Sequence, residues 1–381
     1  MCPLFLVQAA ELTSGMLVVA VSLLFGYTAP RLPSASSFAY AKLPSQQRVV
    51  PLRLREASES DGAQQLPSPF TFPCLTLVAA ATGLAAPKAC APLGSIAFLS
   101  GGLSVLMLSM GLSLTPADLR RALLSPKELV LNLLLCFGAM PLVALALAKL
   151  FHLSAGTAAG LVLLGSVSGG QASNLCALLA GGDLALSVVL TVATTLIGVV
   201  ATPTLVQLLL GTSLTVDAVG VLRSIASLVL APLTVGLVAG RVLPAVVRAI
   251  QDYLPRVGIA ALLVLVAGGS ANAATLLLGS SGAWKAHLGS ILLPIVGGAV
   301  ALAAARLACL NERAVRTLVI ETAIKSPTLA FVLAKKHFVD PATAAAPAAS
   351  MIYLAAIGAA VASAWSRIDP PPPAPSDNAQ Q

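Results

Sequence analysis

Two ionisable residues, Glu321 and Lys325, lie within a largely apolar stretch near the C-terminus of the chain. A charged side chain at the centre of a bilayer costs at least about 2.5–3.5 kcal/mol, so such residues are rare and have partners. Their spacing of four residues would place both side chains on one face of a helix. We expect Glu321 to coordinate a cation, and the alternative is a structural ion pair between the two residues.

Serine, threonine and asparagine side chains elsewhere in the chain offer further oxygen ligands. Ser187 and Thr191 are four residues apart and would share a helix face. Taken singly, a hydroxyl in a membrane helix usually bonds to a carbonyl of the preceding turn. A hard cation instead requires several oxygens that converge on one point. The predicted sodium ligands are Ser173, Asn174, Ser187, Thr191 and Glu321.

The composition indicates that these residues belong to an all-α polytopic membrane protein. The chain has 381 residues, of which 57% are hydrophobic and 9% are charged, and its mean hydropathy is +0.94. Soluble domains average about 45–50% apolar and about 25% charged residues. The formal net charge of +8 comes from single basic residues between apolar runs, so no nucleic-acid partner is expected.

Apolar runs of about 17–25 residues, long enough to cross a hydrocarbon core of about 30 Å, follow one another from residue 70 to residue 367. In lipid the backbone must satisfy its own hydrogen bonds, so these runs are predicted to be helices. The ten predicted transmembrane helices are residues 70–86, 95–114, 129–150, 156–180, 184–210, 222–240, 257–277, 288–308, 317–334 and 342–364. They divide into two five-helix repeats, residues 70–210 and 222–367, and an odd number per repeat gives the repeats inverted topology.

The fourth helix of each repeat carries residues that interrupt a helix. One contains Gly169 and Gly170, and the other contains Pro327; a glycine and a proline destabilise a helix interior by about 1 and 3 kcal/mol. Paired interruptions point to an ion and substrate site at the bilayer midplane, where the new helix N-termini favour an anion. The predicted substrate-binding residues are Gly170, Gln171, Asn174, Lys325 and Ser326.

The two ends of the chain differ from the helical body. Residues 1–69 combine an apolar stretch, residues 12–29, with a basic stretch that has no acidic residue before Glu56. This composition is typical of a targeting leader and linker, and the alternative is an additional membrane helix over residues 12–29. Residues 368–381, with a run of four prolines, are predicted to be a disordered tail.

Three motifs resemble the bile acid:sodium symporter family, especially its plastid organic-anion branch of pyruvate/2-oxo acid transporter-like proteins. The motifs are Ser109-Met-Gly-Leu-Ser-Leu-Thr-Pro-Ala-Asp118-Leu-Arg, Gly169-Gly-Gln-Ala-Ser-Asn174 with Gly182-Asp-Leu-Ala-Leu-Ser187, and Ile320-Glu-Thr-Ala-Ile-Lys-Ser326. The resemblance implies that helices 4 and 9 are broken and cross, and that a panel domain and a core domain rock to give alternating access. By position, it also assigns one family sodium site to the five residues predicted above.

A second family sodium site does not match this sequence. Cys136 and Lys325 stand where the family has glutamines, and Gln171, Ala323 and Ser326 also differ from the family's common residues. We therefore expect one sodium ion per transport cycle. The ammonium group of Lys325 would either take the place of the second sodium or pair with the substrate carboxylate.

The residues and the resemblance together predict a secondary active symporter that moves a small organic anion, a 2-oxo or 2-hydroxy monocarboxylate, with sodium. Two alternatives stay open, a sodium-independent or proton-coupled organic-anion transporter and a carrier of a bulkier bile-acid-like sterol anion. No enzyme is expected, because the histidines lie at predicted helix ends and no zinc-protease motif occurs. Apart from sodium, the lipid bilayer and the anion, no cofactor or obligatory protein partner is expected. The expected location is the plastid (chloroplast) envelope, with the plasma membrane as the alternative.

Overall fold

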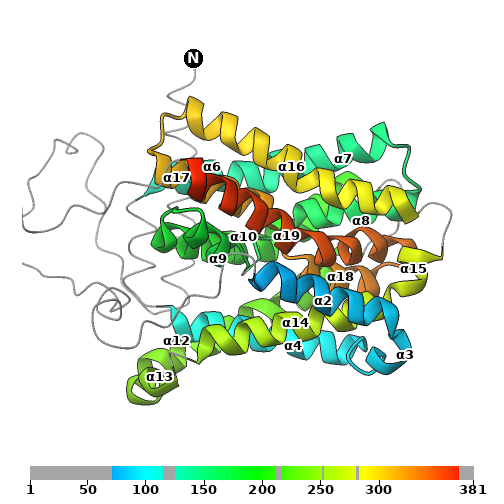
Figure 1. The fold of residues 1–381 in the computed structure, drawn as a ribbon, viewed down its shortest axis with the longest axis horizontal. Helices are drawn as coiled ribbons and strands as arrows, with labels where there is room; N and C mark the ends of the chain where they lie inside the picture. The colour runs from blue at the N-terminus through cyan, green and yellow to red at the C-terminus, as the bar shows by residue number, and fades with distance from the viewer. Residues whose placement is uncertain are drawn as a thin grey trace, which may run out of the picture. The chain divides into compact units, whose positions relative to one another are not determined.

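The computed structural model describes residues 71–114, 125–170, 172–211, 217–250, 253–279 and 283–368. The predicted leader and linker, Gln171 and the predicted tail from residue 369 onward lie outside these residues. Within the described ranges the chain consists of helices joined by short connections and contains no β-strand (Figure 1). This part of the chain therefore has the predicted all-α character.

A helix, continuous or interrupted, occupies each of the ten predicted ranges. In chain order the elements are α2 (Thr71–Ala85), α3 (Pro87–Cys90), α4 (Ile96–Ser113), α6 (Pro126–Leu134), η3 (Leu135–Ala139), α7 (Met140–Leu150), α8 (Ala155–Ser166), α9 (Ala172–Leu179), α10 (Leu184–Leu210), α11 (Ala218–Ile225), η4 (Ala226–Leu230), α12 (Ala231–Val242), α13 (Pro244–Ile250), α14 (Leu254–Asn272), α15 (Ala274–Leu278), α16 (Ala283–Leu307), α17 (Glu312–Ala323), α18 (Pro327–His337), η5 (Pro341–Ala344) and α19 (Ala345–Ile368). Among the described residues, six stretches are long and apolar enough to cross a membrane: Ile96–Ser113, Pro126–Leu150, Leu184–Leu210, Ala218–Val242, Ala283–Leu307 and Pro341–Trp365. Shorter apolar helices are Cys74–Ala85, Ala155–Ser166 and Arg256–Asn272.

Two of the long stretches contain a π-helical turn, η3 in one and η4 in the other. Each turn ends two residues before a proline, Pro141 or Pro232. A proline has no N–H, and its ring clashes with the carbonyl group four residues earlier in an α-helix. The wider π turn relieves this clash and leaves irregular backbone hydrogen bonds behind.

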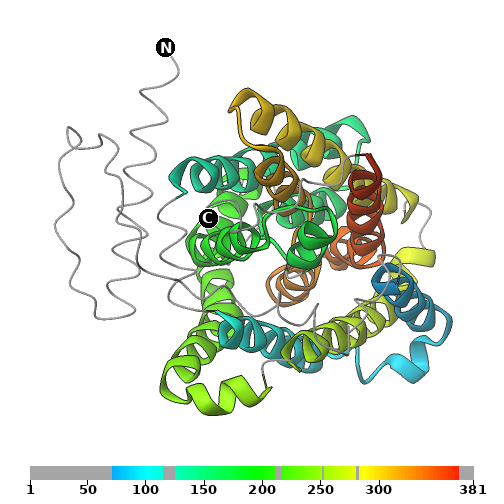
Figure 2. The same ribbon diagram turned by 60° about the vertical axis from the view of Figure 1, so that its left-hand side comes forward.

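The helices pack as two groups that contact each other. In the first group, α4 packs against α12 and α14, and α14 also packs against α2. In the second group, α16 packs against α17 and α19, and α7 packs against α8. Figures 1 and 2 show α2, α4, α12 and α14 lying together on one side and α9, α10, α16 and α17 on the other. The predicted sodium ligands lie on α9, α10 and α17 of the second group.

The two predicted helix interruptions are present. The first separates α8 from α9, and the second separates α17 from α18. Ser326, directly before Pro327, has φ −93° and ψ 88°, because a residue that precedes a proline is sterically disfavoured in the helical region. The second interruption therefore follows from local sequence.

The two interruptions lie side by side and exchange backbone hydrogen bonds. The N–H of Gly170 donates to the carbonyl oxygen of Ile324 at 3.1 Å, and the N–H of Ser326 donates to that of Ser168 at 3.1 Å. Gly169 and Lys325 form an isolated antiparallel bridge at this crossing. Backbone groups that the broken helices leave without intrahelical partners are thus paired across the crossing.

Candidate ion and substrate site

The carboxylate of Glu321 is buried and accepts hydrogen bonds from three hydroxyl groups. Its side chain extends from α17 and is 1% exposed. Ser173 Oγ donates to Glu321 Oε1 at 2.8 Å, and Thr191 Oγ1 donates to Glu321 Oε2 at 2.9 Å. Ser187 Oγ also hydrogen-bonds Glu321 Oε1. All three donors to the carboxylate are therefore neutral hydroxyl groups, and none is a lysine or arginine.

The amide of Asn174 completes this cluster of oxygens. Its Oδ1 atom lies 2.8 Å from Ser187 Oγ and 3.2 Å from Thr191 Oγ1. The cluster thus draws on three elements: α9 supplies Ser173 and Asn174, α10 supplies Ser187 and Thr191, and α17 supplies Glu321. All five predicted sodium ligands lie together in the structure.

Each hydroxyl has one proton, which it can direct either at Glu321 or at a backbone carbonyl, so the hydroxyls can exchange their bonds to Glu321 for backbone bonds when a cation binds. Ser173 Oγ lies 2.7 Å from the carbonyl oxygen of Gly170, and Thr191 Oγ1 lies 3.0 Å from that of Ser187. A hydroxyl proton directed at the backbone leaves both lone pairs of its oxygen free. The described part of the chain contains no group of three or more His, Cys, Asp or Glu residues that could hold a metal ion. One carboxylate among neutral oxygens suits a hard cation better than a transition metal.

The structure corrects the expected geometry of Lys325. Helix α17 ends at Ala323, so Glu321 and Lys325 do not share a helix face, and no ion pair joins them among the described residues. The ammonium group instead donates to the carbonyl oxygen of Cys136 at 3.2 Å. It also lies 5.9 Å from the ring centre of Phe137. The direct ion pair considered from the sequence is therefore not formed, although the two charges still interact over a longer distance.

The other predicted substrate residues gather at the crossing, except Gln171, which lies outside the described residues. The backbone N–H of Ser326 donates to the carbonyl oxygen of Ser168 in the other interruption. Asn174 belongs to the oxygen cluster. Gly170 faces the backbone of Lys325, where a Cβ atom would lie 2.6 Å from the Lys325 carbonyl oxygen. Glycine is therefore required for the close approach of the two interruptions.

Comparison with known proteins identifies the family. A family profile described as the Sodium Bile acid symporter family matches residues 101–279. The chain is 37% identical over 271 residues to the probable sodium/metabolite cotransporter BASS1, chloroplastic, of Arabidopsis thaliana, which covers 71% of this chain and 67% of the relative. The chain belongs to the sodium bile acid symporter family. This agrees with the resemblance seen in the three motifs.

Two rice proteins extend the comparison. The probable sodium/metabolite cotransporter BASS2, chloroplastic, of Oryza sativa subsp. japonica is 35% identical over 269 residues, which cover 69% of this chain and 62% of the relative. The corresponding BASS3 protein of the same subspecies is 31% identical over 318 residues, 81% of this chain and 74% of the relative. The match thus spans less than two thirds of the BASS2 relative. With its six apolar stretches, this family member is a multi-pass membrane protein, and its chloroplastic relatives place it in the plastid envelope.

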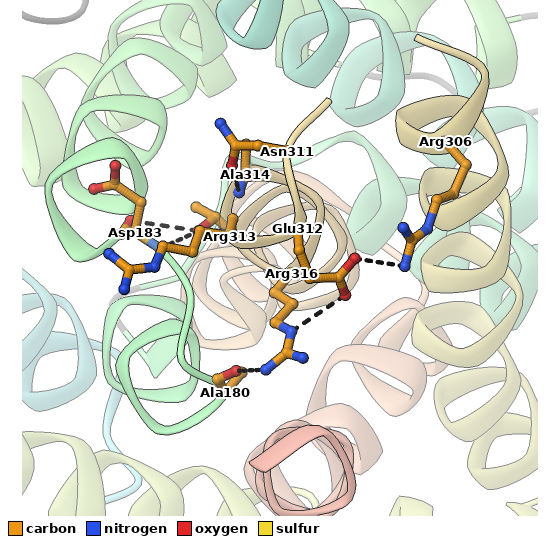
Figure 3. A network of polar contacts seen from close by, with 9 residues as sticks. Ala180, Asp183, Arg306, Asn311, Glu312, Arg313, Ala314 and Arg316 are labelled. Carbon is orange, nitrogen blue, oxygen red and sulfur yellow. Dashed lines mark hydrogen bonds and ion pairs between the residues drawn. The ribbon is translucent and has the colours of Figure 1, made fainter. Parts of the chain in front are cut away.

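A polar network at one end of α17 holds the helices that carry the oxygen cluster of this symporter-family chain (Figure 3). Arg316, which is 2% exposed, donates from Nη1 to the carbonyl oxygen of Ala180 at 2.9 Å, just after the end of α9. Its Nε atom lies 3.3 Å from Glu312 Oε1, and Glu312 Oε2 lies 2.6 Å from Arg306 Nη2. The guanidinium group therefore ties α17 to α9.

A second set of bonds ties α17 to the start of α10. The Thr317 hydroxyl accepts from the N–H of Asp183 at 2.8 Å. Asp183 in turn caps α10, because its Oδ1 atom accepts from the N–H of Leu186 at 3.0 Å. The three helices that supply the predicted sodium ligands are thus fastened to one another by named contacts.

Loss of the buried arginine is expected to loosen this arrangement. Arg316→Met leaves the Ala180 carbonyl oxygen without that donor, which costs about 1–3 kcal/mol for a buried group. A change of 1 kcal/mol shifts the melting temperature of a larger domain by about 2–4 °C. Thermal unfolding of the detergent-purified protein measures the shift. Arg306→Met is the matched control, because its guanidinium is 57% exposed and an exposed ion pair contributes about 0–1 kcal/mol; an equal loss in both variants would contradict the role of burial.

Two buried polar residues that border Cys136 were not predicted from the sequence. Asn132 on α6 and Thr322 on α17 are both 0% exposed, and neither Asn132 Nδ2 nor Thr322 Oγ1 has a hydrogen-bond partner. A single amide within the apolar run Leu129–Leu135 was the available signal for Asn132. Thr322 gave no separate signal, because it adjoins Glu321.

Proposed function

We propose that the chain is a secondary active symporter that carries a small organic anion with one sodium ion across the plastid envelope by alternating access. The observation that carries the proposal is the buried oxygen cluster around Glu321 at the crossing of two broken helices. The names of the relatives, sodium/metabolite cotransporters, support sodium coupling. Transport of this kind involves no chemical conversion of the substrate, and we propose no enzymatic activity.

The sodium ligands in this proposal are Ser173, Asn174, Ser187, Thr191 and Glu321. One carboxylate compensates one monovalent charge, which supports a single sodium ion. The alternating movement would displace the helix group of α2, α4, α12 and α14, as a panel, against the group of α9, α10, α16 and α17, as a core. The ten predicted helices would be arranged as two inverted five-helix repeats, since the interruption falls in the fourth helix of each repeat.

The substrate in this proposal is a 2-oxo or 2-hydroxy monocarboxylate. Helices α9 and α18 both begin at the crossing, and their N-terminal ends attract negative charge. The substrate-binding residues would be Gly170, Gln171, Asn174, Lys325 and Ser326. With an aromatic content of 4%, the chain offers few rings to cover a sterol, so a small anion is favoured over a bile-acid-like one.

Uptake of radiolabelled pyruvate into proteoliposomes tests the coupling. An inward sodium gradient is expected to drive accumulation, and a proton gradient of equal size without sodium is expected to drive none. Initial rates should rise with sodium concentration with a Hill coefficient of about one, the value for a single coupled ion. Accumulation driven by protons alone would instead favour protonation of Glu321, and a Hill coefficient near two would contradict the single sodium ion. Competition by taurocholate but not by lactate would favour the sterol alternative.

A further inference from the structure

The ammonium group of Lys325 is buried and makes no ion pair among the described residues. The side chain is 1% exposed. Within the described residues its hydrogen-bond acceptor is the Cys136 carbonyl oxygen, at 3.2 Å, and no carboxylate lies within ion-pair distance. An ammonium group has three donors. Glu321 acts on this charge from beyond ion-pair distance, and the Cys136 thiol also interacts with it. No charged group of the described residues bonds the ammonium directly, so we infer that a direct partner is added in another state of the protein.

The Cys136 carbonyl is available because of the π turn before Pro141. In an α-helix this carbonyl would accept from the N–H of Met140, four residues later. In η3 the Met140 N–H bonds to the Leu135 carbonyl instead. The next candidate donor is Pro141, which has no N–H. The π turn therefore presents a free backbone carbonyl that orients the lysine side chain.

Two further polar groups without partners border the same cysteine. Cys136 Sγ lies 3.7 Å from Asn132 Oδ1, and the thiol also lies beside the side chains of Lys325 and Thr322. The donors Asn132 Nδ2 and Thr322 Oγ1 are fully buried and have no hydrogen-bond partner. Unsatisfied buried polar groups are uncommon in native structures and indicate a missing ligand.

The groups without partners are all hydrogen-bond donors. The ammonium and the amide NH2 can only donate, and the hydroxyl can donate one proton. A cation would be repelled by this set, whereas a carboxylate offers two oxygens with about four acceptor positions. Sodium and anion would thus occupy different places, the sodium among the oxygens on α9 and α10 and the anion beside η3.

We propose that Lys325, Asn132 and Thr322 form the subsite that binds the carboxylate of the transported anion. This inference rests on the proposed transport function and extends it to residues on α6 and α17 that the sequence did not single out. Because the three side chains are buried here, the anion reaches them when the two helix groups separate.

The subsite makes the charge of the core balance in two states. When empty, the crossing of the two interruptions holds one carboxylate, Glu321, and one ammonium, Lys325. When fully loaded, it gains one sodium ion and one monocarboxylate, so its net charge is again zero. With one ligand alone it carries a net charge, which low-dielectric surroundings disfavour. Transport should therefore be electroneutral and should require both ligands together.

Ligand-induced stabilisation of the detergent-purified full chain tests the subsite without relying on transport. The melting temperature is measured in KCl or NaCl, with pyruvate or its uncharged methyl ester as the probe. We expect NaCl to stabilise the wild type, pyruvate to stabilise it further, and methyl pyruvate to add nothing. Lys325→Met should keep the NaCl shift and weaken pyruvate binding by about 100-fold, as for loss of a charge-assisted bond.

Two variants without a change of charge and one control lysine variant distinguish a loss of pyruvate binding from a loss of folding. Asn132→Leu and Thr322→Val keep size and charge and should each weaken pyruvate binding by about tenfold. Lys149→Met, at an exposed position on α7, should change neither shift. If Lys325→Met does not yield folded protein, the two neutral variants still decide the question.

Three outcomes would overturn the subsite: unchanged pyruvate binding in Lys325→Met, unchanged binding in both neutral variants, or no pyruvate shift in the wild type. The first would also favour Lys325 as a fixed cation in place of a second sodium. A missing NaCl shift together with a pyruvate shift that needs Lys325 would refute sodium coupling and leave the subsite standing. The two proposals can therefore fail separately.

The charge balance is tested in proteoliposomes with a potassium diffusion potential set by valinomycin. A potential of about 100 mV changes the distribution of one net charge by about 50-fold. Sodium-driven pyruvate accumulation by the wild type should be independent of the potential. A strong increase with an inside-negative potential would show that more than one sodium ion accompanies each anion, and would overturn the predicted balance.

Discussion

Glu321→Gln is expected to abolish sodium-driven uptake. The carboxylate is the single acidic group in the oxygen cluster, where it accepts bonds from the hydroxyls of Ser173, Ser187 and Thr191. Glutamine keeps the size of the side chain but removes its negative charge, and it turns an NH2 group toward one of the hydroxyls. Loss of a buried charged partner costs about 1.5–3 kcal/mol, which corresponds to a decrease in sodium affinity of about 10–100-fold.

The measurement is initial uptake of labelled pyruvate as a function of sodium concentration, together with the NaCl-dependent shift in melting temperature. Glu128→Gln is the matched control, because Glu128 lies in the first turn of α6 and makes no hydrogen bond or ion pair with the described residues of the oxygen cluster. The control should match the wild type in both assays. Wild-type sodium dependence in Glu321→Gln would refute the proposed sodium site, whereas sodium-independent uptake that the variant loses would favour proton coupling.

Gly170→Ala is expected to disrupt the crossing of the two interruptions. The added methyl carbon would lie 2.6 Å from the carbonyl oxygen of Lys325, and a backbone oxygen cannot rotate away as a flexible side chain can. The chains must therefore move apart, which lengthens the bond from Gly170 N–H to the Ile324 carbonyl and shifts Lys325. Overpacking of this kind costs about 1–3 kcal/mol, so uptake should fall at least tenfold, and the melting temperature should drop.

Gly101→Ala supplies the control for this substitution. Gly101 lies on α4 and is exposed, and a Cβ atom added to it would meet no neighbouring atom within 4 Å. In a helix interior alanine is more favourable than glycine by about 1 kcal/mol, so this control should be neutral or slightly stabilising. Wild-type uptake and stability in Gly170→Ala would mean that the close contact between the two interruptions is not needed for transport.

Local sequence determined the class of the protein and most helix positions. The low content of charged residues and the apolar runs of membrane-spanning length can be read from each segment by itself. Helices occupy the ten predicted ranges. The second interruption was also predictable, because Pro327 constrains Ser326 whatever lies nearby. The spacing of Ser187 and Thr191 likewise placed both on one face of α10, where both contact Glu321.

The partner of Lys325 was decided by the tertiary structure alone. The four-residue spacing from Glu321 suggested a shared helix face, but α17 ends at Ala323 before the lysine is reached. The ammonium then bonds to a carbonyl that is free because Pro141, on another helix, forces a π turn. No pattern within the segment around Lys325 contains that information.

The roles of Arg316 and Asn132 likewise depend on tertiary packing, unlike those of the residues predicted from local sequence. Arg316 lies in a polar stretch typical of a helix end at the membrane surface, yet it is 2% exposed and bonds to Ala180, which is distant in the chain. Asn132 is a single amide in an apolar run, and its importance appears only because the Cys136 that it contacts also accepts a bond from the distant Lys325. Helix class, length and interruptions arise from interactions within a few residues, which the sequence by itself determines. Which buried polar groups meet depends on how distant helices pack, and this only the tertiary structure decided.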